Sequence, residues 1–280
     1  MLLLYPHCRQ PPPRVRVSRT GRPFFLRLSQ AKPFQPADET SVIPWISLDT
    51  AIVPGGGGEL RLGQRGAEFS IMLGQNELMN SRLSGSEEAL ATISLSRMQD
   101  RERPHVLIGG LGMGFTLRAA LAELGPEARV TVAELVPAVV AWARGPMAEI
   151  FGDSLTDPRL TILEEDVAGL IRSARAAYDA ILLDVDNGPE GLTREANDRL
   201  YNMEGLCAAR TALRPGGVLA VWSSGPNRNF ARRLRQTGLE VDELRVRANG
   251  AGGGARHIIW IATNPGAFHL RSTRNRRQRV

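Results

Sequence analysis

From about residue 105 onward, short apolar segments alternate with helix-like segments, and four of the apolar segments end in glycine-rich or acidic residues. The glycine-rich segment 109–114 follows the first, and Glu134, Asp166 and Asp184 follow later ones. Strands that alternate with helices form parallel sheets. Because ligands of open parallel sheets bind outside the carboxyl ends of the strands, these four signals predict one nucleotide-binding crevice.

The expected strands and helices fall in two regions. Residues 43–98 contain short alternating segments between glycine-rich turns, which indicate a small antiparallel sheet. Ser84 and Glu87, spaced as a capping pair, then indicate the start of a helix. Beyond residue 101 the expected strands are 106–108, 130–132, 160–163, 180–183, 218–222, 240–246 and 257–262, and the expected helices lie near 117–124, 137–149, 167–175, 198–213 and 227–237. The Pro-Gly-Gly sequence at 215–217 is expected to end the fourth of these helices sharply.

The two ends of the chain differ in charge from its body. Residues 1–36 hold seven basic and no acidic side chains, and residues 266–280 hold five and none, although the whole chain has a formal net charge of only +6. Basic stretches that bury little apolar surface are expected to be disordered. We therefore predict four parts: a disordered basic leader (1–42), a small β-domain with a linking helix (43–100), an α/β domain (101–265) and a disordered basic tail (266–280).

Composition disfavours several functional classes. The single lysine, Lys32, lies in the basic leader, which argues against Schiff-base chemistry and a phosphate loop. The two cysteines and four histidines lack metal-ligand spacing, so no metal site is expected, and Cys207 is interpreted as buried. No nucleic-acid motif accompanies the basic ends, and no apolar run reaches the ~20 residues of a membrane span. We expect a cytoplasmic protein without a nucleic-acid or membrane partner.

The glycine-rich segment predicts a loop that approaches a ligand closely. It follows a strand and precedes a helix, so its backbone N–H groups would lie at a helix N-terminus. Counted from Gly110, the dinucleotide fingerprint requires a third glycine where Phe115 stands, and Gly114 instead gives the spacing G-x-G-x-G. This spacing favours S-adenosylmethionine over NAD.

The two acidic residues after the second and third strands suit the nucleoside part of such a ligand. Glu134 lies twenty residues beyond Gly114, where a carboxylate accepts hydrogen bonds from both ribose hydroxyls. Asp166, followed by Val167, is placed to accept a hydrogen bond from an adenine amino group. It is equally placed to cap the following helix, and both roles can coexist.

Asp184 ends the apolar run Ile181-Leu182-Leu183. A carboxylate there would be poorly hydrated and would point into the crevice. It would orient an incoming amine, accept its proton and favour a cationic sulfonium by charge. Asp186 and Asn187 follow in a predicted turn, and for Asp186 turn formation and substrate contact are both open.

These residues resemble the class I S-adenosylmethionine-dependent transferases, and within them the spermidine synthase (polyamine aminopropyltransferase) branch. The resemblance covers about residues 43–265. It rests on Gly109–Gly114, Glu134, Asp157-Pro158-Arg159, Asp166, Tyr178–Asp184, Gly188–Thr193 and Arg214–Gly217. It implies an α/β fold with a Rossmann-like, seven-stranded methyltransferase sheet behind a small N-terminal antiparallel β-domain, often in a homodimer.

The resemblance also implies which residues form the site. Asp184 fits the catalytic carboxylate, and the substrate-binding positions fall on Asp186, Asn187 and Glu88. The expected cofactor-binding residues are Gly109, Gly110, Gly112, Gly114, Glu134, Asp166, Val167 and Asp184. The chain departs from the family at three places: an aspartate of the glycine motif is replaced within Leu111-Gly112-Met113, a second aspartate is replaced by Asn187, and the family's Tyr-His-Glu reads Ser86-Glu87-Glu88.

The sequence thus predicts an enzyme that binds S-adenosylmethionine or its decarboxylated form, without a metal, and alkylates a small amine. The order of the motifs favours aminopropyl transfer, and the replaced acidic residues favour methyl transfer. A different hypothesis is a non-catalytic nucleotide-binding or scaffold protein whose basic ends recruit an anionic partner. An NAD-dependent oxidoreductase is disfavoured by Phe115 and by the lack of a His or Tyr at a strand end.

Overall fold

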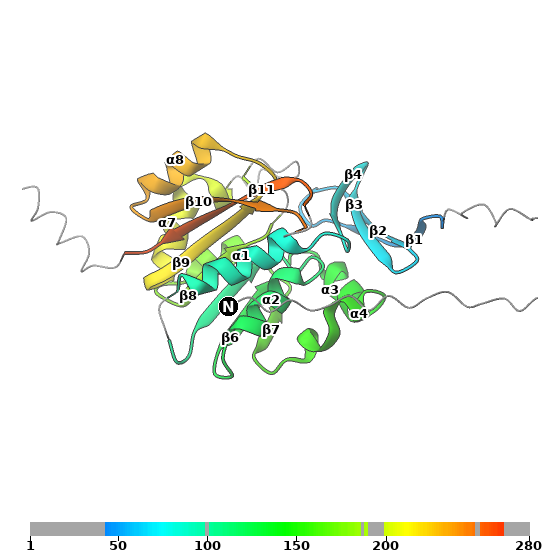
Figure 1. Ribbon diagram of the computed structural model, residues 1–280, viewed down its shortest axis with the longest axis horizontal. Helices are drawn as coiled ribbons and strands as arrows, with labels where there is room; N and C mark the ends of the chain where they lie inside the picture. The colour runs from blue at the N-terminus through cyan, green and yellow to red at the C-terminus, as the bar shows by residue number, and fades with distance from the viewer. Residues whose placement is uncertain (1–42, 99–100, 186–187, 190–198, 250–252, 266–280) are drawn as a thin grey trace, which may run out of the picture. The chain divides into compact units, whose positions relative to one another are not determined.

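The computed structural model describes residues 43–98, 101–185, 188–189, 199–249 and 253–265. The basic leader and the basic tail lie outside these residues, as do Asp186 and Asn187. The described residues form a seven-stranded sheet with helices on both faces and a separate four-stranded sheet (Figure 1).

The seven-stranded sheet is mixed, with its central strands parallel. Its order is β10-β11-β9-β8-β5-β6-β7, and β11 runs in the opposite direction to the other six strands. The strands are β5 (His105–Gly109), β6 (Arg129–Ala133), β7 (Leu160–Leu163), β8 (Tyr178–Leu183), β9 (Leu213–Ser223), β10 (Glu240–Arg247) and β11 (Arg256–Thr263). This arrangement confirms the predicted Rossmann-like, seven-stranded sheet.

Alternating side chains of the strands form two cores, one on each face of the sheet. In β5, Val106 and Ile108 belong to one core and Leu107 to the other, as the twofold period of a strand requires. The first core is covered by α1 (Gly85–Ser96), α2 (Phe115–Glu123), α3 (Pro137–Arg144) and α4 (Ala148–Phe151). The second is covered by α5 (Val167–Ser173), α7 (Met203–Ala212) and α8 (Arg228–Gln236). In Figure 1, α7 and α8 accordingly lie across the sheet from α1 and α2.

The small sheet is an antiparallel meander of β1 (Ile46–Ile52), β2 (Glu59–Arg65), β3 (Glu68–Leu73) and β4 (Asn76–Asn80). Its buried face continues the first core through Leu62 and Ile71, both completely buried. The edge strand β1 leaves Ile46 and Ile52 exposed. The small sheet therefore packs against the rest of the α/β domain through this shared core.

Four details differ from the expectations. The helix expected at 137–149 is divided into α3 and α4, because the chain turns at Gly145. Strand β9 begins at Leu213 instead of the expected 218, so it includes the segment 214–217 and has a register shift in its pairing to β8. Cys207 is exposed, since α7 buries Leu206 and Ala209 instead. Ser84 occupies the N-cap of α1 without a side-chain hydrogen bond, so Glu87 is not half of a capping box.

The amino ends of the central strands are held by a buried carboxylate. Asp179, in β8, has a completely buried side chain and accepts a 2.8 Å hydrogen bond from the His105 backbone N–H. Arg101 and Arg214 form ion pairs with its two oxygens at 2.9 and 2.5 Å. These partners tie β5, β8 and β9 together at the edge of the sheet opposite the predicted crevice.

Candidate active site

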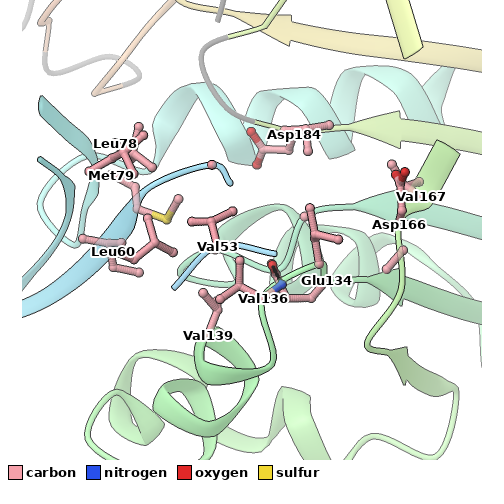
Figure 2. A pocket seen from close by; sticks show the side chains of 18 of the residues that line it. Val53, Leu60, Leu78, Met79, Glu134, Val136, Val139, Asp166, Val167 and Asp184 are labelled. Carbon is pink, nitrogen blue, oxygen red and sulfur yellow. Dashed lines mark hydrogen bonds between the residues drawn. The ribbon is translucent and has the colours of Figure 1, made fainter. Parts of the chain in front are cut away.

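A cavity opens at the carboxyl ends of β5 and β8, where the helices that follow the strands change faces. The helix after β5, α2, packs in the first core, and α7, which lies between β8 and β9, packs in the second. Such a switch point is where open α/β sheets bind ligands. Figure 2 shows Glu134, Asp166 and Asp184 around this cavity, with Leu60 and Met79 of the small sheet on the other side.

The loop between β5 and α2 forms the floor of the cavity, and three of its glycines have positive φ angles. A Cβ at Gly110 (φ +88°) would lie 2.5 Å from the Asp184 carbonyl oxygen, and one at Gly112 (φ +50°) would lie 3.1 Å from the Met79 sulfur. A Cβ at Gly114 (φ +76°) would overlap the ring of Phe151. Contacts within the protein therefore require these glycines.

The four predicted glycines have different positions in the site. Gly110 and Gly112 line the cavity. Gly109 is the last residue of β5, and a Cβ there would meet Leu183 and Val167 at 3.1 Å, so it serves the packing of the sheet. Gly114 is the N-cap of α2 and lines a second cavity.

Glu134 follows β6 and is buried, with an 8% exposed side chain. One carboxylate oxygen accepts the Leu111 backbone N–H and the other accepts the Val136 N–H, both at 2.9 Å. Burial raises the pKa of Glu134, and these backbone hydrogen bonds oppose the rise. The backbone thus fixes the carboxylate at the cavity wall.

Asp166 is exposed at the cavity and is the N-cap of α5. Its side chain accepts a 2.9 Å hydrogen bond from the Ala168 backbone N–H. The capping role left open by the sequence is therefore present. Val167 is buried beneath it and also lines the cavity, where Figure 2 shows the two side by side.

Asp184 lies just past the end of β8, where two cavities share it as a lining residue. The Thr116 hydroxyl, in the first turn of α2, donates a 2.7 Å hydrogen bond to its carboxylate. Burial, together with the negative charge of Glu87, raises the pKa of Asp184 to about 7, and the Thr116 hydrogen bond opposes the rise. A carboxylate with such a pKa can exchange protons near neutral pH.

The second cavity contains a carboxylate that the sequence interpretation did not place there. Glu87, in the first turn of α1, lines it together with Asp184 and Trp222. The Ser86 hydroxyl donates a 2.6 Å hydrogen bond to Glu87, and Nδ1 of His257 lies 2.8 Å from the Ser86 oxygen. Burial is the main cause that raises the pKa of Glu87. These residues bring α1 and β11 to the same site.

Glu88 is exposed and lines neither cavity, contrary to its expected position among the substrate-binding residues. Consecutive residues of a helix point about 100° apart, so α1 turns Glu87 inward and Glu88 outward. The sequence signal for Glu87 was its place among buried positions of α1 such as Leu90 and Ser94, at i+3 and i+7. The sequence interpretation instead made Glu87 part of a capping pair with Ser84 and so did not assign it to the site.

Two features are absent from the described residues. No three or more His, Cys, Asp or Glu side chains in the described ranges are grouped so that they could hold a metal ion. No described helix has the length and apolar character needed to cross a membrane.

The strand order, the glycine loop after the first parallel strand and the acidic residue after the second define a protein with the class I methyltransferase fold. Solved structures agree with this assignment. The chain matches spermidine synthase from Thermotoga maritima with a TM-score of 0.63 and 18% identity, covering 78% of this chain and 72% of that one. It matches spermidine synthase in complex with the transition-state analogue AdoDATO with a TM-score of 0.62 and 17% identity, again covering 78% and 72%.

Sequence similarity points to the same branch. The chain is 35% identical over 127 residues to polyamine aminopropyltransferase 1 of Streptomyces coelicolor, covering 44% of this chain and 23% of that protein. It is 32% identical over 156 residues to polyamine aminopropyltransferase of Korarchaeum cryptofilum, covering 54% and 46%. No protein-family model matches the sequence. The chain thus has the fold of spermidine synthases and is similar in sequence to polyamine aminopropyltransferases over about half of its length, and it spans less than half the length of these two curated relatives.

Proposed function

We propose that this protein transfers the aminopropyl group of decarboxylated S-adenosylmethionine to a small amine. The observation that carries the proposal is the position of Asp184, at the junction of two cavities beside the switch point of the sheet. A transfer between two substrates needs the electrophilic carbon of the donor and the nitrogen of the acceptor to meet beside one reacting group. The similarity to polyamine aminopropyltransferases supports this choice of reaction.

The residues around the first cavity suit an adenosyl group. Glu134 lies at the cavity wall, where its carboxylate would accept hydrogen bonds from the ribose hydroxyls. Asp166 caps α5 through one oxygen, which leaves the other for an adenine amino group. Apolar side chains of the small sheet, including Leu60 and Met79, would cover the flat base. The assigned donor-binding residues are therefore Gly110, Gly112, Glu134, Asp166 and Val167.

Asp184 would act as the base and as a counter-charge. In the transfer a nitrogen–carbon bond forms, the carbon–sulfur bond of the sulfonium breaks with its electron pair left on sulfur, and the amine loses one proton. Asp184 accepts that proton, and its negative charge favours the cationic donor before transfer. Thr116 holds the carboxylate in place through its 2.7 Å hydrogen bond. The products are an extended amine and the neutral thioether 5′-methylthioadenosine.

The proposal assigns residues 43–100 and 101–265 to one catalytic unit, with the small sheet as a wall of the donor cavity. It retains the homodimer and the cytoplasmic location expected from the sequence. The exposed apolar residues of the edge strand β1, Ile46 and Ile52, suit contact with a second copy. The free thiol of Cys207 suits a reducing compartment. Light scattering on the full chain tests the dimer through its mass.

The test of the reaction is product analysis with both donors. The purified protein is incubated with decarboxylated S-adenosylmethionine or with S-adenosylmethionine, each with a panel of alkylamines and diamines. Mass spectrometry then looks for the thioether product of each donor. We expect 5′-methylthioadenosine and an amine heavier by one aminopropyl group. Formation of S-adenosylhomocysteine and a methylated amine instead would contradict aminopropyl transfer.

The scaffold hypothesis gains no support from the described residues or from the similarities. Its basic ends lie outside the described residues. Measurable turnover would eliminate it.

A further inference from the structure

The second cavity is lined by two carboxylates, Glu87 and Asp184. It adjoins the donor cavity, since Asp184, Gly112 and Met79 line both. The loop contributes only uncharged side chains to it, Leu111 and Met113. Among the described residues that line this cavity, Asp184 and Glu87 alone carry a charge.

One buried polar group of the cavity, the indole N–H of Trp222, is available to a bound molecule. Trp222 lines the cavity with a side chain that is 7% exposed, and its indole N–H has no hydrogen-bond partner in the described part of the chain. A buried donor without a partner is unfavourable unless a bound molecule or water satisfies it. The indole ring also offers a face on which a cation can bind.

Glu87 is held in position by neighbouring residues. With Glu87 ionised, the single Ser86 proton is donated to it at 2.6 Å, so Nδ1 of His257 carries the proton that is donated to Ser86 at 2.8 Å. The His257 ring packs edge-on against Trp222, with centroids 4.7 Å apart. Burial lowers the pKa of His257, which favours the neutral ring that this arrangement uses. His257, Ser86 and Glu87 thus form one hydrogen-bonded row that ends at the cavity.

We propose that Glu87 is a specificity-determining residue that, with Asp184, binds the ammonium group at the end of the donor's propyl chain. The inference rests on the proposed function, because it assumes an adenosyl sulfonium in the first cavity. A three-carbon chain matches the apolar surface of Leu111 and Met113, and its ammonium matches two carboxylates. A donor that retains its α-carboxylate would bring a third negative charge into the same cavity and would be repelled.

Calorimetric titration tests this assignment with three compounds: decarboxylated S-adenosylmethionine, S-adenosylmethionine and 5′-methylthioadenosine. The third compound has the adenosyl part but no charged chain. For Glu87→Gln we expect the affinity for the decarboxylated donor to fall about tenfold or more, with the affinity for 5′-methylthioadenosine unchanged. Its preference for the decarboxylated donor over S-adenosylmethionine should shrink accordingly.

Two further variants separate position from charge. Glu88→Gln removes the same charge one residue away, at an exposed position outside the cavity, and should leave all three affinities unchanged. Ser86→Ala keeps Glu87 but removes its hydrogen-bonded support, and should reduce the preference between donors without changing the affinity for 5′-methylthioadenosine.

The outcomes distinguish the inference from the function on which it rests. If Glu87→Gln retains the wild-type preference between donors while still binding 5′-methylthioadenosine, the role of Glu87 is wrong and the adenosyl site stands. If the wild-type protein binds none of the three compounds, the proposed function and the inference both fail.

Discussion

Two aspartates of the same strand, Asp179 and Asp184, have opposite environments. Asp179 lies near the amino end of β8 and pairs with Arg101, Arg214 and a backbone N–H. Asp184 lies just past the carboxyl end, where it accepts a hydrogen bond from the Thr116 hydroxyl and its charged neighbour is another acid, Glu87. The two arginines compensate the negative charge of Asp179. Burial and the nearby Glu87 make the negative charge of Asp184 unfavourable. The difference separates a group that holds the fold from a group that is available for chemistry.

The largest expected effect is on turnover in Asp184→Asn. An amide cannot accept the proton of the amine, so the rate should fall by about 100-fold or more. Affinity for 5′-methylthioadenosine, which has no charged chain, should change much less, because Glu134 and Asp166 are intact. The measurement is steady-state kinetics with release of 5′-methylthioadenosine as the signal. A loss of affinity for 5′-methylthioadenosine as large as the loss in turnover would contradict the role of Asp184 as a base.

Asp179→Asn should show the reverse pattern. It leaves two partly buried arginines without a counter-charge, and removing one partner of a buried ion pair costs about 3 kcal/mol. The free energy of unfolding should fall by that order, as measured by urea denaturation. Turnover per folded molecule should remain near the wild-type value. A fall in turnover without loss of stability would show that the two edges of the sheet are not separated in this way.

Glu134→Gln should lower the affinity for the donor by about 10-fold to 100-fold. The ionised carboxylate makes charge-assisted hydrogen bonds to hydroxyls, which are worth ~1.5–3 kcal/mol. Titration with 5′-methylthioadenosine measures the loss without the charged chain. Thermal melting of the same variant is the control, because the backbone N–H groups of Leu111 and Val136 also lose the carboxylate. Unchanged affinity would remove Glu134 from the ribose site.

The smallest expected effect is the pH dependence of stability. The folded-state pKa of Asp184 is raised from 3.8 to about 7, so its contribution to stability is fully present below pH 4 and is lost as pH rises through 7. Asp184→Asn, which is always neutral, should therefore melt at a higher temperature than the wild type at pH 8, by a few degrees. The two proteins should melt close together at pH 4. A constant difference across this range would show that Asp184 does not titrate there.

Periodicity in the sequence was sufficient for the main sheet. Each expected strand beyond residue 101 overlaps an observed strand. The central parallel strands are buried apolar runs, and the edge strand β10 is an alternating segment. The limits of some elements were less accurate. Gly145 divides one expected helix, and β9 begins at Leu213 instead of the expected 218. In both places tertiary packing decided the outcome.

The site was predictable where residues follow strands and not where they depend on a helix rotation. Glu134, Asp166 and Asp184 meet at one cavity because the carboxyl ends of neighbouring parallel strands lie together. Glu87 and His257 are 170 residues apart in the chain, and only the packing of α1 against the sheet brings them together through Ser86. A contact between residues so far apart in the chain cannot be predicted from their spacing in the sequence. Glu88 was chosen in place of Glu87 for the same reason.

The most direct test of the central claim is a crystal structure of the protein with 5′-methylthioadenosine. We predict that the ribose hydroxyls will contact Glu134, that the adenine amino group will contact Asp166, and that the thioether sulfur will lie beside Asp184 at the junction of the two cavities. A ligand bound elsewhere, or bound with its sulfur directed away from Asp184, would contradict the claim that the carboxyl edge of the sheet is the transfer site.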